Sequence, residues 1–327
     1  MKKLTFFCVV AIAIILSGCN KNLSVQPHWT QLNSGTNSDL IDVFFSSPDL
    51  GYVLTDSNLI LKTTNGGKTW RSLPIQHATE ASSLFFTSER TGYVIDHNSY
   101  VLKTINGGES WDYAFGGYQD YYLTSMCFTS PDVGYVVGGK FTSYEGCILK
   151  TTDGGVTWHD LSNKIESVIF YTVYFIDDNT GIIAGDSGEI FKTTDGGNTW
   201  TKLNSETNAL FIKSFFISPN TGYVAGGNKM GDGGKILKTM DGGNTWKVMG
   251  TGTRIITNLF FSSDHIGYAL CSNAQAKGII LKTTDGGSTW SPEPFDEFPG
   301  YLSSVFFPEA NTGYVVGQGG TIIKWGF

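Results

Sequence analysis

The chain has 327 residues, including 41 Gly, 22 Phe, 15 Tyr and 8 Trp, and a net charge of −7. Its many aromatic residues and its 16% of charged residues exclude a disordered chain, and 9 Pro are too few for collagen. Because the charge is acidic and no basic stripe is present, we expect no nucleic-acid partner.

The N-terminus has the layout of an export signal. A basic start precedes an apolar run over residues 6–16, which is too short to span a bilayer. The run ends in Leu-Ser-Gly-Cys at Cys19, which resembles a bacterial lipoprotein box, and the resemblance implies lipidation of Cys19 after removal of residues 1–18. We expect residues 19–27 to form a tether that holds the protein in the cell envelope, at an outer membrane or on the periplasmic or extracellular side of a membrane. The alternative is an ordinary secretory signal with a chance cysteine.

Three further cysteines, Cys127, Cys147 and Cys271, follow in the exported part. An odd set cannot pair completely, so we interpret them as small buried hydrophobic residues in preference to a disulfide.

A repeat then organises the rest of the chain. The string Lys-Thr-x-(Asp/Asn)-Gly-Gly-x-(Thr/Ser)-Trp occurs six times, over residues 62–70, 103–111, 150–158, 192–200, 238–246 and 282–290. Each unit also contains an apolar strand ending in Phe, a strand that begins with Gly and an Ile-Leu-Lys-Thr type of strand. Tyr follows that Gly in six of the seven units, and Ile182 is the exception. We call the four strands of each unit a, b, c and d, with Trp opening d. Four strands at a period of roughly 40–45 residues predict a β-propeller over residues 28–327.

The two ends of the repeat set the number of blades. The last unit has strands a, b and c but stops before a d strand, whereas Trp29–Leu32 is a d strand without a unit. The sequence therefore predicts an all-β, seven-bladed propeller of four-stranded antiparallel blades, whose last blade is closed by the N-terminal strand. Such closure removes the open sheet edges.

The repeated string predicts structural roles for its fixed residues. The Gly-Gly pair suits a turn with positive φ, the Asp or Asn before it accepts turn amides, and the Trp packs between blades. These positions are Asn65, Asn106, Asp153, Asp195, Asp241 and Asp285, with Trp70, Trp111, Trp158, Trp200, Trp246 and Trp290. We expect no phosphate or calcium loop here, because neither motif is present.

This string resembles the Asp-box, or BNR, repeat of sialidase-like propellers, and the whole unit is most similar to the photosystem II stability and assembly factor-like propellers. That resemblance covers essentially all of residues 28–327. It implies a non-enzymatic scaffold that docks on a membrane-protein subunit, often through an Arg patch. This chain has only Arg71, Arg90 and Arg254, which are scattered and form no such patch.

We expect the Asp boxes to occupy one face of the ring and the variable b–c and d–a loops to occupy the other, which we call the loop face. Aromatic residues on rigidly held loops are binding-surface candidates, although ordinary packing is an alternative for each of them. The candidates are Tyr118, Tyr121, Tyr122, Tyr144, Arg254, Phe298 and Tyr301.

A polar residue stands three positions before the last Phe of every a strand. This polar column predicts side chains that line a central channel, either as a solvated wall or, as the alternative, as a ligand pocket. Its members are Asp42, Ser83, Ser125, Thr172, Lys213, Asn258 and Ser304.

The two resemblances together imply a membrane-anchored scaffold that binds a protein client. A carbohydrate-binding or glycoside hydrolase propeller is the alternative, because two suitably spaced carboxylates suffice for glycoside hydrolysis. Sialidase activity is disfavoured because there are too few Arg and no Arg-Ile-Pro triplet. We expect no metal site and no cofactor, since the five His show no paired spacing. Carboxylates that such a hydrolase would use are Asp42, Asp96, Asp120, Asp186 and Glu297.

Overall fold

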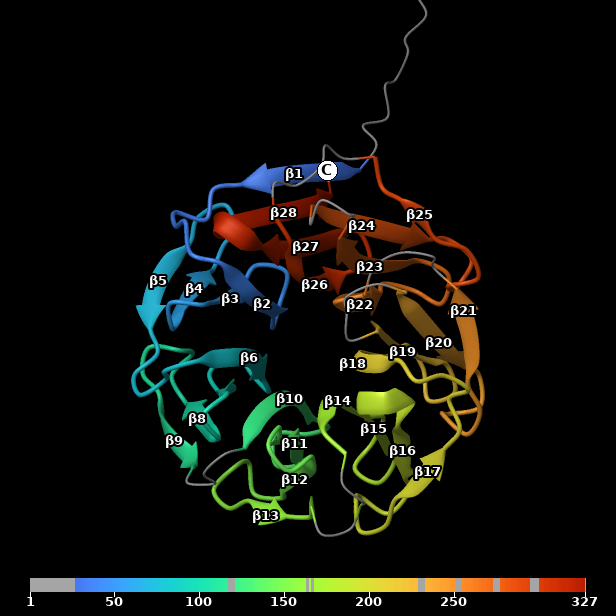
Figure 1. Cartoon of the computed structure of the whole chain (residues 1–327). Coiled ribbons are helices and arrows are strands. Elements are labelled where there is room, and N and C mark those ends of the chain that lie inside the picture. The colour runs from blue at the N-terminus through green and yellow to red at the C-terminus, as the bar shows by residue number, and fades with distance from the viewer. Residues whose placement is uncertain are drawn as a thin grey trace, which may run out of the picture.

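The computed structural model describes residues 27–116, 121–162, 165, 168–228, 233–250, 255–272, 277–294 and 300–326. These residues form seven four-stranded antiparallel sheets, arranged as blades around a central axis (Figure 1). The predicted seven-bladed propeller is confirmed.

The first three blades follow the chain from the axis outward. Blade 1 contains β2 (Leu40–Phe45), β3 (Gly51–Thr55), β4 (Leu59–Thr63) and β5 (Arg71–Pro74). Blade 2 contains β6 (Ala81–Phe86), β7 (Gly92–Asp96), β8 (Tyr100–Thr104) and β9 (Asp112–Phe115). Blade 3 contains β10 (Tyr122–Phe128), β11 (Gly134–Lys140), β12 (Glu145–Thr151) and β13 (His159–Asp160).

The next three blades repeat this order. Blade 4 contains β14 (Phe170–Phe175), β15 (Gly181–Gly185), β16 (Ile190–Thr193) and β17 (Thr201–Leu203). Blade 5 contains β18 (Leu210–Phe216), β19 (Gly222–Gly227), β20 (Lys235–Thr239) and β21 (Lys247–Gly250). Blade 6 contains β22 (Asn258–Phe261), β23 (Gly267–Ser272), β24 (Gly278–Thr283) and β25 (Ser291–Pro292).

Blade 7 joins the two ends of the chain. It contains β26 (Leu302–Glu309), β27 (Thr312–Gly317), β28 (Thr321–Gly326) and, on its outer edge, β1 (His28–Leu32). Trp29 lies opposite Trp325 in the β1–β28 ladder, and β1 is the outermost strand of that blade in Figure 1. The N-terminal strand therefore closes the ring, as the sequence predicts.

The hydrophobic core is divided among the seven blade interfaces. Each of seven buried clusters combines residues of two neighbouring blades. In one, the Trp111 ring of blade 2 lies with Tyr52 of blade 1, and in another Trp29 meets the Tyr268 ring edge-on at 5.8 Å. The d-strand tryptophans thus pack between blades, which couples every blade to the next.

Each Asp box is a closed hydrogen-bonded turn. In blade 3, the Asp153 carboxylate accepts the backbone N–H and the hydroxyl of Thr157, at 2.8 and 2.6 Å. Thr151 Oγ1 accepts the N–H of Gly155 at 2.8 Å, and Gly155 has a φ of 80° that favours glycine. The two hydrogen bonds from Thr157 lower the Asp153 pKa to about 2. The box carboxylate is therefore a turn-forming acceptor.

A lysine and a tyrosine of one blade bind the Asp box of the next. Lys103 Nζ and the Tyr93 hydroxyl in blade 2 both donate to the Gly154 carbonyl in blade 3, at 2.5 and 2.7 Å. The same lysine contact recurs from blade 1 to 2, 3 to 4, 5 to 6 and 7 to 1. We call this pair of contacts the blade clamp. Because the clamp joins each such pair of neighbouring blades, it explains why Lys and Tyr recur in the repeat.

The remaining features are few. Cys127, Cys147 and Cys271 are buried and form no disulfide within the described residues, and burial raises the pKa of Cys127 to about 11. Two short 3-10 turns, η2 (Asp186–Gly188) and η3 (Gln318–Gly320), occupy b–c loops. Within the described ranges there is no helix of the length and apolarity that crossing a membrane requires.

Candidate binding site at the mouth of the central channel

The innermost strands carry the residues that face the axis. In six of the seven a strands the pairing register shifts just before the polar-column residue, as between Leu40 and Asp42. A bulge of this kind adds one residue and re-aims a side chain. The added residues are Ile41, Ser82, Thr124, Tyr171, Ile212 and Ser303.

The polar column forms a belt of hydrogen bonds between blades. Asp42 Oδ2 accepts the Ser83 hydroxyl at 2.9 Å and the Leu84 N–H at 3.1 Å, both from blade 2. Asp42 Oδ1 accepts the Ser304 hydroxyl of blade 7 at 2.8 Å. The carboxylate therefore links three blades at the axis.

Other column residues act in the same way. Thr172 Oγ1 accepts the Ser214 N–H at 2.9 Å, and Ser125 Oγ accepts the Val173 N–H at 3.3 Å. Because an innermost strand has no further strand on its axial side, its N–H groups need such acceptors. This requirement explains the polarity of the column.

These side chains surround an axial cavity of about 280 Å³. Lys213 lines the cavity from blade 5. Asn258 of blade 6 is not among its lining residues, and its Nδ2 donates to Ser304 Oγ at 3.3 Å. Toward the Asp-box end a second tier is aromatic, with Phe215 and Phe260 centroids 4.9 Å apart and Phe44 and Phe306 centroids 5.1 Å apart. The channel is thus narrowed by aromatic rings on that side.

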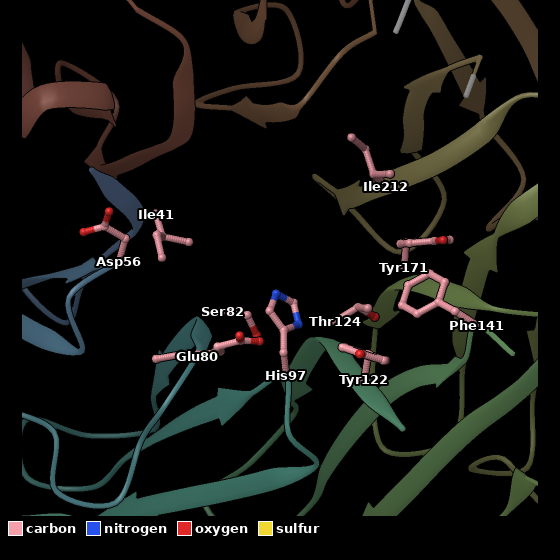
Figure 2. Close-up of a pocket in the computed structure, with 11 residues that line it drawn as sticks. Ile41, Asp56, Glu80, Ser82, His97, Tyr122, Thr124, Phe141, Tyr171 and Ile212 are labelled. Atoms are coloured by element: carbon pink, nitrogen blue, oxygen red, sulfur yellow. The ribbon is translucent and has the colours of Figure 1, made fainter. Parts of the chain in front are cut away.

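The larger cavity lies at the loop face, over the mouth of the channel, and we call it the mouth pocket. Its volume is about 640 Å³, within the range of ordinary ligand sites. Figure 2 shows Ile41 and Asp56 on one side, Phe141 and Tyr171 on the opposite side, and His97 between them. The lining comprises Ile41, Asp56, Glu80, Ala81, Ser82, His97, Tyr122, Thr124, Phe141, Tyr171 and Ile212.

One wall of the mouth pocket is aromatic. The ring centroids of Tyr122 and Phe141 are 5.0 Å apart, those of Phe141 and Tyr171 are 6.3 Å apart, and those of His97 and Tyr122 are 6.2 Å apart. Tyr122 is 39% exposed and Phe141 45% exposed. The wall is therefore held by ring contacts across blades 2 to 4 but remains open to a ligand.

Asp96 fixes the loops beside this wall. It is completely buried, and its carboxylate accepts the N–H groups of Thr79 at 2.6 Å and Glu80 at 2.8 Å. The same carboxylate accepts the Asn98 N–H at 2.7 Å. It thereby joins the d–a loop that carries Glu80 to the b–c loop that carries His97, and both side chains reach the pocket from a fixed backbone.

The Ser82 and Thr124 hydroxyls of the lining are already used within the fold. Ser82 Oγ donates to the Ile95 and Leu123 carbonyls at 3.2 and 3.4 Å. Thr124 Oγ1 donates to the Val137 and Phe170 carbonyls at 3.1 and 2.8 Å. The bulge residues of blades 1 to 5 therefore all line the pocket, and the polar ones, Ser82 and Thr124, also bridge neighbouring blades.

The predicted binding-face residues occupy different environments in the structure. Tyr122 lines the mouth pocket, whereas Tyr121 is half-buried, with Lys140 Nζ 4.7 Å above its ring. Tyr144 is exposed in a turn with φ 58°. The Tyr301 hydroxyl donates to Asp39 at 2.8 Å, which raises its pKa to about 12. Tyr118, Arg254, Phe298 and Cys19 lie outside the described residues.

Sequence reasoning did not single out Phe141, Tyr171, Ile41 or Ile212. The last three precede a column residue, so a break in strand alternation at that position is the signal that was available. His97 was passed over because no second His stands at a metal-binding spacing from it.

The carboxylates named for glycoside hydrolysis are engaged by the fold. Asp42 and Asp96 accept the bonds described above, and buried Asp186 accepts the Ser187 N–H at 2.8 Å. Asp120 and Glu297 lie outside the described residues. Within the described part of the chain, no three His, Cys, Asp or Glu residues are grouped as a metal site would require.

Comparison with known proteins identifies the repeat. The family model described as photosynthesis system II assembly factor YCF48 matches residues 21–115 and 118–210. No sequence among the curated proteins matches the chain.

Solved structures share the fold. YCF48 from Cyanidioschyzon merolae is 19% identical with a TM-score of 0.72, over 91% of this chain and 98% of that one. A structure of YCF48 bound to D1 peptide is 17% identical with a TM-score of 0.72, over 91% and 97%. The GH74 xyloglucanase from Xanthomonas campestris is 14% identical with a TM-score of 0.70, and the match spans 90% of this chain but 53% of the enzyme.

Proposed function

This chain belongs to the photosynthesis system II assembly factor YCF48 family, and we propose that it is a non-enzymatic, membrane-tethered propeller that binds a protein client on its loop face. The observation that carries the proposal is the mouth pocket, an open cavity with exposed aromatic residues on a closed ring of blades. Loops on a rigid scaffold are where such proteins place their binding residues.

A related propeller lends support, because a structure of YCF48 is described as bound to D1 peptide. The client of the present chain is a different one in our proposal. Arg71 pairs with Glu109 on the outer edge of the ring, and Arg90 Nε donates to the Ile105 carbonyl at 3.3 Å. Neither arginine lines the mouth pocket, so among the described residues an acidic client would find no Arg patch there.

The test is site-specific photo-crosslinking in native membranes. A photoreactive phenylalanine derivative replaces Tyr122 in the full chain, and the control places it at Met240, which is 74% exposed in a blade 5 Asp box. We expect a reproducible protein adduct from position 122 and none from position 240. Equal adducts from both positions, or none from position 122, would contradict a client on the loop face.

The tether is proposed from the lipoprotein-like N-terminus. We propose that Cys19 carries the lipid and that the protein resides in the cell envelope. An alkyne-labelled fatty acid supplied to cells should label the wild-type chain, and Cys19→Ala should abolish the label and release the chain from the membrane fraction. Labelling that persists in Cys19→Ala would show that another residue carries the lipid.

A carbohydrate ligand is the second candidate. Aromatic walls such as Tyr122 with Phe141 also suit sugar rings, and the GH74 likeness supports a fold that can serve carbohydrates. Binding of xyloglucan oligosaccharides that disappears in Phe141→Ala but not in Met240→Ala would replace the protein client by a glycan.

A further inference from the structure

Resting on the proposed function, we propose that the mouth pocket selects a short client segment that combines a Lys or Arg side chain with aliphatic neighbours. The pocket offers an aromatic wall, two aliphatic side chains and two carboxylates. The segment would place its aliphatic part between Ile41 and Ile212 and its cation near Asp56 and Glu80.

Charge is the first argument. Asp56 and Glu80 are both exposed and both line the pocket, and no Lys or Arg is among its described lining residues. Two lysines are near the pocket but do not line it. Lys140 pairs with Glu145 at 3.8 Å and lies over the Tyr121 ring, and Lys213 lines the axial cavity below. The field at the mouth therefore favours a cation.

The aromatic wall is the second argument. A cation gains energy over the face of a Tyr or Phe ring, most of all where water is partly excluded. The protein itself uses this contact, since Lys140 Nζ lies 4.7 Å from the Tyr121 ring centre beside the pocket. Tyr122 and Phe141 present partly open rings within reach of the same cavity.

The hydrogen-bonding inventory is the third argument. An acidic or phosphorylated segment needs several donors. The Ser82 and Thr124 hydroxyls donate to backbone carbonyls, and the other donor-bearing side chains of the lining are His97 and two tyrosines, with no Lys or Arg among the described lining residues. Carboxylates are acceptors only, and they suit the ammonium or guanidinium group of a basic segment. With a volume of about 640 Å³, the cavity suits a few side chains and not a folded domain.

The experiment is a selection of random heptapeptides on the full chain held in detergent micelles. The test variants are Phe141→Ala and the double variant Asp56→Asn/Glu80→Gln. The matched controls are Met240→Ala and Asp132→Asn/Glu89→Gln, which change an apolar and two exposed acidic residues on the Asp-box face.

We expect enriched peptides with Lys or Arg beside Leu, Ile or Val. Their affinity should fall about 3- to 30-fold in Asp56→Asn/Glu80→Gln, as two exposed ion pairs imply, and should weaken with added salt. The Asp-box-face controls should bind like the wild type, and Phe141→Ala should lose binding.

Acidic or uncharged consensus peptides, or a double variant that binds like the wild type, would overturn the inference. These outcomes are separable from the proposed function. A client adduct at position 122 together with an acidic consensus would leave the scaffold in place and refute only the basic segment. The absence of both adduct and enrichment would refute both.

Discussion

The two faces of the ring are built by the same strands but under different constraints. On the Asp-box face, the boxes of blades 3 to 6 share one carboxylate bonding pattern, and lysines reach across to the neighbouring box. On the loop face the corresponding loops differ in length, residues and charge, and the mouth pocket opens there. The repeat therefore stabilises the ring through contacts on the Asp-box face and leaves the residues of the loop face free to vary.

The interface between blades 4 and 5 departs from this pattern but keeps a tyrosine hydrogen bond between the two blades. Blade 4 has Ile182 where the other blades have Tyr, and Lys192 Nζ donates to Asn244 Oδ1 at 2.8 Å. Tyr174 of the inner strand compensates, because its hydroxyl donates to the Phe216 carbonyl of blade 5 at 3.0 Å. A cross-blade tyrosine bond is thus kept at this interface although the repeat position has changed.

The largest effect should come from breaking closure. Trp29→Ala removes a ring that is 5% exposed and meets Tyr268 and Phe307, so the free energy of unfolding should fall by about 3–5 kcal/mol. Denaturant unfolding measures this loss. Gln31→Ala, an exposed change in the same strand, is the control, and an equal loss in both variants would mean that the Trp29 side chain is not what closes the ring.

A single clamp bond should matter less. Tyr93→Phe removes the hydroxyl that donates to the Gly154 carbonyl but keeps the ring stacked on Phe128 at 4.2 Å. We expect a loss of about 0.5–1.5 kcal/mol, because Lys103 still binds that carbonyl. Tyr174→Phe should cost a similar amount by the same unfolding assay. No change in either variant would show that the clamp is incidental to stability.

Acid should weaken the Asp-box face selectively. Hydrogen bonds from a threonine lower the box Asp pKa to about 2, below the ordinary value of about 3.9. Since the folded pKa is depressed, the contribution is present above about pH 4 and is lost as the pH falls toward about 2. The positions are Asp153, Asp195, Asp241 and Asp285.

Blades 1 and 2 supply the matched replacement. Asn65 Oδ1 accepts the Thr69 N–H at 3.0 Å, as the Asp boxes do. A variant with all four box Asp changed to Asn should therefore fold at pH 7 and show a shallower loss of stability between about pH 4 and pH 2. Melting temperatures across that range test this, and parallel curves for variant and wild type would be inconsistent with it.

The smallest stability effect should come from the mouth pocket. Phe141→Ala changes a side chain that is 45% exposed, so the free energy of unfolding should change by no more than about 0.5 kcal/mol. Client binding should nevertheless be lost. A large destabilisation would mean that the aromatic wall is a structural element and would weaken the comparison between the two faces.

The sequence predicted those parts of the fold that depend on the regular spacing of the repeat. The period, the Gly-Gly turns and the orphan strand at Trp29 predicted the blades and their closure, because each depends on local spacing. The mouth pocket was harder to predict. A bulge at Ile41 or Tyr171 adds a residue to one strand without changing the period, so the side chains that it re-aims cannot be located from spacing alone.

The polar column illustrates the same limit. Its position at the axis could be inferred from Asp42 and its equivalents, but not its hydrogen bonds to neighbouring blades, because those depend on how the blades are rotated against each other. Tyr122 was predicted as a binding candidate on the loop face and lines the pocket. Phe141, which directly follows β11 (Gly134–Lys140), lines it too but was not among the predicted residues.

The closure has a consequence for how the protein is made. The first strand of the propeller, β1, pairs with the last, β28, and Trp29 lies opposite Trp325, so all the intervening strands are synthesised before the partner strand exists. Until then, the seat of Trp29 and the outer edge of the final blade stay open, and exposed edges of this kind promote aggregation. Such long-range pairing is also slow. Newborn chains should therefore depend on being kept apart until β28 has been translated.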